Sequence, residues 1–372
     1  MKIFENIVGQ PQVIETLKNA VIAARENSEL SQKMNHSWLF TGPPGSGKST
    51  VAKVFAAALL CSNSGCGECV DCITAMDGSH LDIDILKSDT LSIKVDEIRD
   101  LISRTSTSPS ISNWRVVIIQ DTQRLTEAAA NALLRVIEEP GARNVWILCV
   151  PSNVEVLPTI KSRCRQINFR TPSNHSVVQF IKENFGVDSA IAELVAHISD
   201  GNLNTAKFYA KNSNLITWRN TALCLLLEVQ NISGAYSATS KILETLDSIV
   251  NMSVNSAGDT DMEKLIQISK KVKDNYEKDQ KNFKTKSLKE LLDQLLTDYL
   301  QIYTDVIKIK LIPHSKIMNA EWEKEIRDIH SNKATEEVLE TISTILIAKK
   351  LLEKNISPQL IIEVLSSSTL NI

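Results

Sequence analysis

The sequence lacks several features that would assign a chain to a broad class at once. No apolar run approaches the roughly 18 residues of a membrane span. Residues Met1 to Asn6 lack the basic and then apolar layout of a signal peptide. A basic excess is also absent, because the net charge is −3 and the pI is near 6.1. We therefore expect a cytoplasmic protein that makes no membrane contact and does not grip nucleic acid through a basic surface of its own.

Cysteines are few, but four of the seven lie close together. In the cytoplasm they are expected to be thiols or metal ligands and not disulfides. Thiolates at such spacings suit tetrahedral Zn²⁺. A redox pair and an iron–sulfur ligand set are alternatives, but the x₃-C-P continuation of ferredoxins is missing. We predict a structural zinc knuckle with the ligands Cys61, Cys66, Cys69 and Cys72.

Residues 41–50, TGPPGSGKST, fit the phosphate-binding spacing G-x-x-x-x-G-K-[ST]. A surface turn could fit by chance, but an apolar run at 38–40 and an Ala-rich run at 51–60 supply the expected strand and helix. The loop amides contact phosphate, the lysine reaches the β- and γ-phosphates, and the hydroxyl ligates Mg²⁺. The sequence thus predicts a site for ATP or ADP with Mg²⁺, formed by Gly42, Pro44, Gly45, Ser46, Gly47, Lys48, Ser49 and Thr50.

Strand-like and helix-like patterns alternate through residues 1–171. Apolar runs at 83–86, 115–119, 145–150 and 166–169 predict buried strands, and helices are expected at 95–102 and 126–139, the latter with Thr126 as N-cap. The alternation predicts an α/β fold whose parallel sheet has helices on both faces. Beyond Pro172 only helical periodicity remains: a small module to residue 214, then long helices at 215–372, including 261–276 and 285–312.

The predicted phosphate site lacks part of the chemistry of hydrolysis. Such enzymes need a carboxylate at the end of a neighbouring strand to hold Mg²⁺, and a second one commonly polarises the attacking water. The strand at 115–119 runs instead into Gln120, Asp121 and Thr122, so one acidic group is missing in either register. Glu138 or Glu139 could replace it only if the end of their helix reaches the site. We predict a pocket that binds nucleotide and cleaves it poorly.

Together, several stretches resemble the AAA+ clamp-loader subunits of bacterial DNA polymerase III. They are the phosphate loop, the four-cysteine insertion, LTEAAANALL at 125–134 running on to Glu138-Glu139-Pro140, and LPTIKSRC at 157–164. The resemblance is specific over residues 1–170 and greatest to the non-motor delta-prime subunits. It implies an AAA+ core at 1–171 with the zinc module at about 61–72, a helical lid at 172–214 and an all-α collar at 215–372.

The resemblance also implies roles for single residues. Val8 would lie near the adenine, and Arg163 of the Ser-Arg-Cys motif would be an arginine finger that enters the ATP site of an adjacent subunit. Motor subunits carry an Asp-Glu pair where this chain has Gln120 and Asp121, the degenerate Walker B pair. They also carry a lid arginine where this chain has Asn204. Both departures favour a subunit that does not drive the ATP cycle.

The resemblance implies a stator-like subunit in a hetero-pentameric ring with gamma/tau and delta subunits. Such a ring, part of the polymerase III holoenzyme, would load the sliding clamp onto primer–template DNA. One alternative is an ATP-hydrolysing motor subunit of gamma/tau type, against which Gln120 and Asn204 count. Another is a zinc-dependent DNA-binding repair factor, which the acidic balance and the absence of interleaved basic and aromatic residues near the cysteines disfavour.

Overall fold

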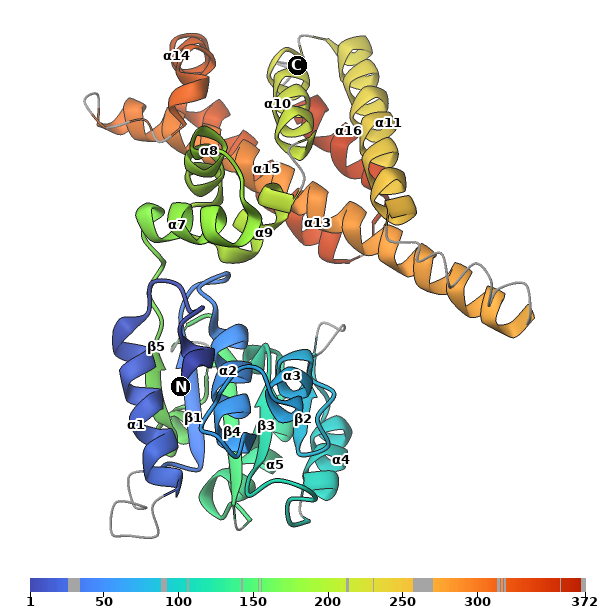
Figure 1. Cartoon of the computed structure of the whole chain (residues 1–372). Helices are drawn as coiled ribbons and strands as arrows, with labels where there is room; N and C mark the ends of the chain where they lie inside the picture. Colours follow the sequence, from blue (N-terminus) through green and yellow to red (C-terminus); the bar gives the residue numbers. More distant parts are fainter. Residues whose placement is uncertain are drawn as a thin grey trace. The chain divides into compact units, whose positions relative to one another are not determined.

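The computed structural model describes residues 1–25, 34–87, 92–256 and 270–368, apart from positions 106, 142, 153, 155, 212, 213, 230, 313, 314, 316, 318 and 355. The chain forms two compact units, Met1–Ala210 and Lys211–Ile372. Figure 1 labels their helices and strands. The narrower division into core, lid and collar stays a prediction. Among the described residues, no helix combines the length and apolar character that crossing a bilayer requires.

A five-stranded parallel sheet forms the centre of the first unit, as predicted. Its order is β2-β3-β4-β1-β5. Because all strands run the same way, the sheet has a carboxyl edge, where every strand ends, and an amino edge, where every strand begins. The strands are β1 (Ser37–Thr41), β2 (Ile83–Leu86), β3 (Arg115–Ile119), β4 (Asn144–Val150) and β5 (Arg165–Asn168).

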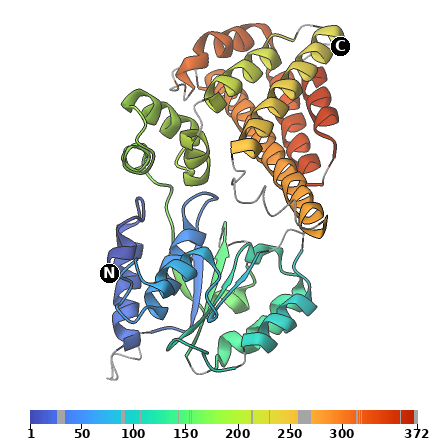
Figure 2. The same cartoon turned by 45° about the vertical axis from the view of Figure 1, so that its right-hand side comes forward.

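Helices cover both faces of this sheet (Figure 2). One face packs against α1 (Pro11–Arg25), α2 (Lys48–Leu60) and α3 (Val70–Asp77), and the other against α4 (Val95–Thr105), α5 (Glu127–Glu138) and α6 (Pro158–Lys161). A hydrophobic core lies on each face of the sheet, and successive side chains of β1 point into opposite cores. Trp38 and Phe40 pack in the core beneath α1–α3, and Leu39 packs in the core beneath α4–α6. The pattern predicted α4 and α5, whereas α3 and α6 were not predicted.

Helix α5 begins at the predicted cap. The Thr126 hydroxyl accepts a hydrogen bond from the Ala129 amide at 3.3 Å. We expect Thr126→Ala to lower the free energy of unfolding of the first unit by about 1 kcal/mol, because an N–H at the helix start loses its partner. Denaturant titration measures the loss. Thr159→Ala, which removes an exposed hydroxyl from another helix, is the control, and equal effects of the two changes would contradict the capping role.

Three further helices complete the first unit: α7 (Asn174–Phe185), α8 (Ser189–Ser199) and α9 (Leu203–Lys211). They agree with the small helical module that the periodicity predicts up to residue 214. Two short 3₁₀ turns, η1 (Lys2–Phe4) and η3 (Thr122–Arg124), flank the metal and nucleotide sites described below.

The second unit is entirely helical in its described residues. The predicted break between helices at 261–276 and 285–312 is wrong, because one helix runs unbroken from Lys270 to Leu311; residues 261–269 lie outside the described residues. In the core, Arg219 donates to Asp298 at 2.6 Å. The elements are α10 (Asn214–Leu227), α11 (Ile232–Ser256), α13 (Lys270–Leu311), η5 (Ala320–Trp322), α14 (Glu323–Asn332), α15 (Thr335–Glu353) and α16 (Pro358–Ser368).

Candidate nucleotide and metal sites

The phosphate loop joins β1 to α2 at the carboxyl edge of the sheet. The amide of Gly42 donates to the carbonyl of Val150 at 3.3 Å, so the loop departs beside the end of β4. Gly47 adopts a left-handed conformation (φ 90°) and leads directly into α2, which begins at Lys48 and not at the predicted residue 51. The first turn of α2 and its unpaired amides therefore face the loop, as phosphate binding requires.

The Lys48 ammonium lies over the loop itself. It donates to the carbonyl of Gly42 and, at 2.8 Å, to that of Pro43. Burial lowers the pKa of Lys48, and the nearby Cys149 and Asp121 act in the opposite direction. The buried Ser46 hydroxyl has no hydrogen-bond partner among the residues that the structure describes. The loop thus places the Lys48 ammonium and the Ser46 hydroxyl, which accepts and donates no hydrogen bond among the described residues, where a phosphate is expected.

The N-terminal segment closes one side of this loop. Asn6, Ile7 and Val8 line a small cavity together with P-loop residues and with Phe180 and Leu203 of the helical module. Gln10, which is buried, holds the segment in place: its Nε2 donates to the carbonyl of Arg170 at 2.6 Å and to that of Ser46 at 3.4 Å. Val8 therefore lies beside the loop, while its contact with adenine stays a prediction.

The helical module contacts the loop directly within the first unit. The Leu203 amide donates to the Gly45 carbonyl at 3.0 Å, and a Cβ on Gly45 would lie only 1.9 Å from the Asn202 side-chain oxygen. Only glycine fits at position 45, where φ is also +75°. Asn204 lines the cavity, and so does Lys207, one turn farther along α9. Sequence reasoning missed Lys207, although its spacing from Asn204 was a usable signal.

Gln120 lies beside Ser49, the P-loop residue whose hydroxyl is predicted to ligate Mg²⁺. Its amide donates to the Leu86 carbonyl at 2.9 Å, which extends the β2–β3 ladder by one residue. Gln120 lines a cavity of about 510 Å³ together with Ser49, Lys53 and Asp77. This position favours the alternative in which Gln120, and not Asp121, occupies the place of the carboxylate that holds Mg²⁺ in hydrolytic P-loop enzymes. At that place the chain then has a neutral amide. Asp77, at the end of the unpredicted helix α3, is a carboxylate in this cavity that sequence reasoning missed.

The backbone turns away from the line of β3 at Asp121. This residue adopts a left-handed conformation (φ 57°, ψ 44°) and starts η3. It lies near enough to Lys48 to act on the pKa of that residue. The Asp121 carboxylate therefore belongs to the surroundings of the P-loop lysine. Thr122, the next residue, is buried and its hydroxyl donates to the Ile119 carbonyl at 3.2 Å, so it has no role as a base.

Glu138 and Glu139 are too far away to replace the missing acid. Helix α5 runs back from the carboxyl edge, and the Ile137 carbonyl accepts a hydrogen bond from the Ser37 hydroxyl at the start of β1. Glu138 therefore lies at the amino edge. Since β1 has five residues at about 3.3 Å each, the two edges are about 16 Å apart along this strand.

Arg163 lies at the amino edge as well. It lies two residues before the start of β5, and β5 runs parallel to β1, with Arg165 opposite Trp38. Its guanidinium pairs with the Glu138 carboxylate and donates to the Thr159 carbonyl at 3.1 Å. Its side chain remains 39% exposed. Arg163 is thus remote from the P-loop of its own chain and accessible to another molecule.

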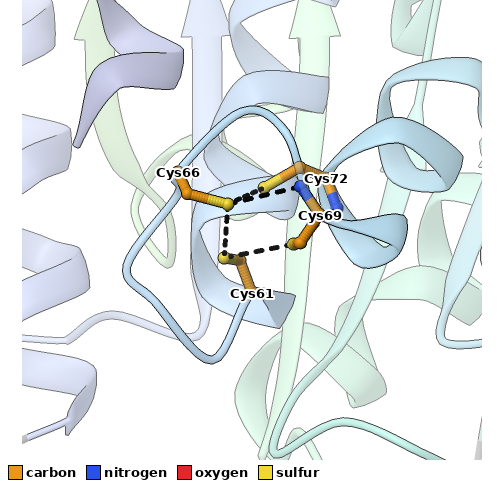
Figure 3. A group of neighbouring side chains, drawn as sticks. All are labelled: Cys61, Cys66, Cys69 and Cys72. Atoms are coloured by element: carbon orange, nitrogen blue, oxygen red, sulfur yellow. Dashed lines mark hydrogen bonds between the residues drawn. The ribbon is translucent and has the colours of Figure 1, made fainter.

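The four predicted metal ligands converge on one point (Figure 3). All four sulfurs lie within 4.8 Å of one another. The separations are 3.5 Å for Cys61–Cys69, 3.8 Å for Cys61–Cys66 and 4.0 Å for Cys66–Cys72. A tetrahedron with Zn–S bonds of about 2.3 Å has sulfur–sulfur edges of about 3.8 Å. The cluster therefore fits zinc in size and in ligand type.

Each sulfur also receives one backbone N–H, at 3.3–3.5 Å, from Asn63, Cys69, Cys72 or Gly67. Such bonds favour the thiolate that a metal needs. The amides of Glu68 and Cys69 lower the pKa of Cys66 to about 6, whereas burial raises the pKa of Cys72. The knuckle packs on η1, where the Ile3 amide donates to the Gly65 carbonyl at 3.2 Å.

Comparison with known proteins finds bacterial DNA polymerase III subunits that are similar to this chain. A family model described as "DNA polymerase III, delta subunit" matches residues 10–173. DNA polymerase III subunit tau of Bacillus subtilis is 33% identical over 213 residues, which cover 55% of this chain and 36% of that protein. DNA polymerase III subunit gamma of Buchnera aphidicola subsp. Baizongia pistaciae is 25% identical over 335 residues, which cover 87% of this chain and 81% of that protein.

The chain thus spans only about a third of the length of the tau and gamma/tau relatives that match it at 32–33% identity. The match to a gamma subunit-related protein of Thermotoga maritima covers 95% of this chain and 97% of that chain, at 16% identity and with a TM-score of 0.46. Together with the P-loop, the parallel sheet and the cysteine knuckle, the family match over residues 10–173, which is less than half of the chain, supports a bacterial clamp-loader AAA+ protein.

Proposed function

We propose that the chain is a non-motor subunit of delta-prime type in the DNA polymerase III clamp loader. It completes the ATPase site of the adjacent subunit with Arg163 and helps to load the sliding clamp onto primer–template DNA. One observation carries this proposal: Arg163 and the P-loop lie at opposite edges of one sheet. An exposed arginine so placed serves a nucleotide on another chain, where its fixed charge stabilises the γ-phosphoryl group.

The pocket of the chain itself is proposed to hold ATP or ADP with Mg²⁺ and to hydrolyse it slowly. The P-loop residues are complete, with Ser49 beside Gln120. The neutral Gln120 weakens the metal site, and Asn204 offers no charge to the γ-phosphate. Catalysis of phosphoryl transfer rests on positioning and electrostatics, so each loss raises the barrier.

The second unit is proposed to be the collar that joins the subunits of the ring, among them gamma/tau and delta. Large apolar side chains are exposed on α15 and α16, although the core below them is already filled. Leu339 and Leu346 lie seven residues apart on α15, and Leu360 and Val364 lie four apart on α16, so each pair shares one helix face. Such faces are suited to contacts with other helices.

A gamma/tau-type motor is the second candidate function. Relatives of this chain in Bacillus subtilis and Buchnera aphidicola carry tau and gamma names. Asp121 beside Lys48 and Asp77 beside Ser49 retain negative charge around the pocket. The candidates differ in the rate of hydrolysis, because Arg163 is expected to act in trans in both.

We expect the isolated chain to bind a fluorescent ATP analogue in the presence of Mg²⁺ and to turn ATP over at least a hundredfold more slowly than a motor subunit, since one catalytic group is missing. Lys48→Ala should abolish binding, with Lys182→Ala, at an exposed lysine of α7, as the control. Restoring the acids with Gln120→Asp and Asp121→Glu should raise turnover. Fast hydrolysis by the unchanged chain, lost in Lys48→Ala, would instead establish the motor.

A further inference from the structure

We propose that Glu138 is the positioning residue of the arginine finger. The inference rests on the proposed trans role of Arg163, under either the delta-prime or the gamma/tau assignment. It concerns the means by which an exposed arginine at the amino edge is held ready for the nucleotide of another chain.

The backbone at Arg163 is fixed from both sides. Ile160 and Cys164 are buried in the core beneath α5 and α6. The Arg163 amide donates to the Ile160 carbonyl at 3.1 Å, which continues the single turn of α6. The position of the Cα atom is therefore set by packing, and only the direction of the long side chain remains to be fixed.

Three contacts fix that direction. The Nε atom of Arg163 donates to the Glu138 carboxylate, while Nη1 donates to the Thr159 carbonyl at 3.1 Å and to the Ser162 hydroxyl at 3.3 Å. The Nη2 atom has no hydrogen-bond partner within the part of the chain that the structure describes. One side of the guanidinium is thus held by its own chain, and Nη2 remains available to an incoming phosphoryl oxygen.

Glu138 contributes the charged contact, and it comes from a different element, 25 residues earlier in the sequence. A charge-assisted contact is stronger and more directional than one to a neutral carbonyl or hydroxyl. The pair stays accessible, with 39% of the Arg163 side chain and 46% of the Glu138 side chain exposed. Loss of Glu138 therefore leaves the fold intact but frees the arginine to sample directions that do not reach the neighbouring nucleotide.

The test uses the complete clamp loader assembled with each variant, with the P-loop lysines mutated in every subunit except the one that receives Arg163. Glu138→Gln, which keeps the side-chain shape and removes the charge, should lower kcat at the remaining site about tenfold, since small misplacements of a catalytic group have large kinetic effects. KM and the amount of assembled ring should not change. Glu139→Gln, on the adjacent exposed carboxylate, is the matched control and should have no effect.

A double-mutant cycle separates positioning from a structural role. In an Arg163→Ala background, Glu138→Gln should have no further effect on kcat, because nothing is left to position. Additive losses, or an unchanged kcat in Glu138→Gln while Arg163→Ala is strongly impaired, would overturn the role of Glu138. An Arg163→Ala ring that keeps full activity would overturn the proposed function instead, so the two failures are distinguishable.

Discussion

Arg163→Ala is expected to lower ATP turnover at the neighbouring site of an assembled clamp loader by about a thousandfold, the lower end of what an arginine finger contributes. The reason is geometric. Arg163 lies at the amino edge of the sheet, about 16 Å along β1 from the edge that carries its own P-loop. Its charge therefore has no role in its own pocket, and its loss should leave nucleotide binding by the isolated chain unchanged.

Turnover should be measured in a ring in which only the subunit next to this chain keeps its P-loop lysine, because other active sites would mask the loss. Lys161→Ala removes a nearby cation from the same helical turn and is the control. Arg163→Lys should recover only part of the rate, since an ammonium lacks the planar fork of the guanidinium. Equal rates for Arg163→Ala and the unchanged chain, at equal assembly, would contradict the trans role.

The second large effect is expected from the cysteine knuckle. We expect one zinc ion per chain, lost in Cys66→Ser and in Cys69→Ser, with unfolding of the knuckle. Structural zinc contributes about 10–16 kcal/mol of binding free energy in zinc-finger peptides. That is comparable with the whole free energy of unfolding of a typical domain, about 5–15 kcal/mol. Chelation should therefore lower the Tm of the first unit markedly and expose η1, which packs on the knuckle.

Elemental analysis, thermal denaturation and hydrogen exchange at residues 2–5 and 61–77 measure these effects. Cys224→Ser removes an exposed thiol of the second unit and is the control for loss of a cysteine as such. Zinc affinity should fall as the pH is lowered, because protons compete for the thiolates. Iron in place of zinc, or an unchanged Tm after complete metal removal, would contradict a structural zinc site.

Local patterns predicted the parts of the fold that local chemistry dictates. A P-loop needs its glycines, lysine and hydroxyl in one continuous stretch, and the apolar strand before it is buried over its full length. The cysteines of a knuckle lie within twelve residues, so their spacing alone placed them together. The Thr126 cap also depends only on residues three apart, and the structure confirms it.

What the sequence did not reveal depends on contacts between distant segments. Glu138 and Arg163 are 25 residues apart, and only the antiparallel course of α5 against the strands brings them together. Lys207 and Asp77 enter cavities beside the P-loop from the helical module and from the knuckle helix. Helix α13 was split in the prediction because residues 277–284 carry no apolar periodicity, yet Lys, Glu, Asp and Gln do not break a helix.

The separation of P-loop and Arg163 across the sheet gives the module a direction. If Arg163 acts in trans as proposed, each subunit accepts an arginine at its P-loop end and supplies one from the opposite end of its sheet. Neighbouring subunits then associate head to tail and not as a two-fold dimer. A subunit that supplies its arginine finger but hydrolyses ATP slowly would then end the series of hydrolysing sites. The subunit that receives Arg163 hydrolyses ATP, whereas the subunit that supplies it does so only slowly. The series of hydrolysing sites around the assembly would thus have a defined last member, set by the neutral side chains at positions 120 and 204.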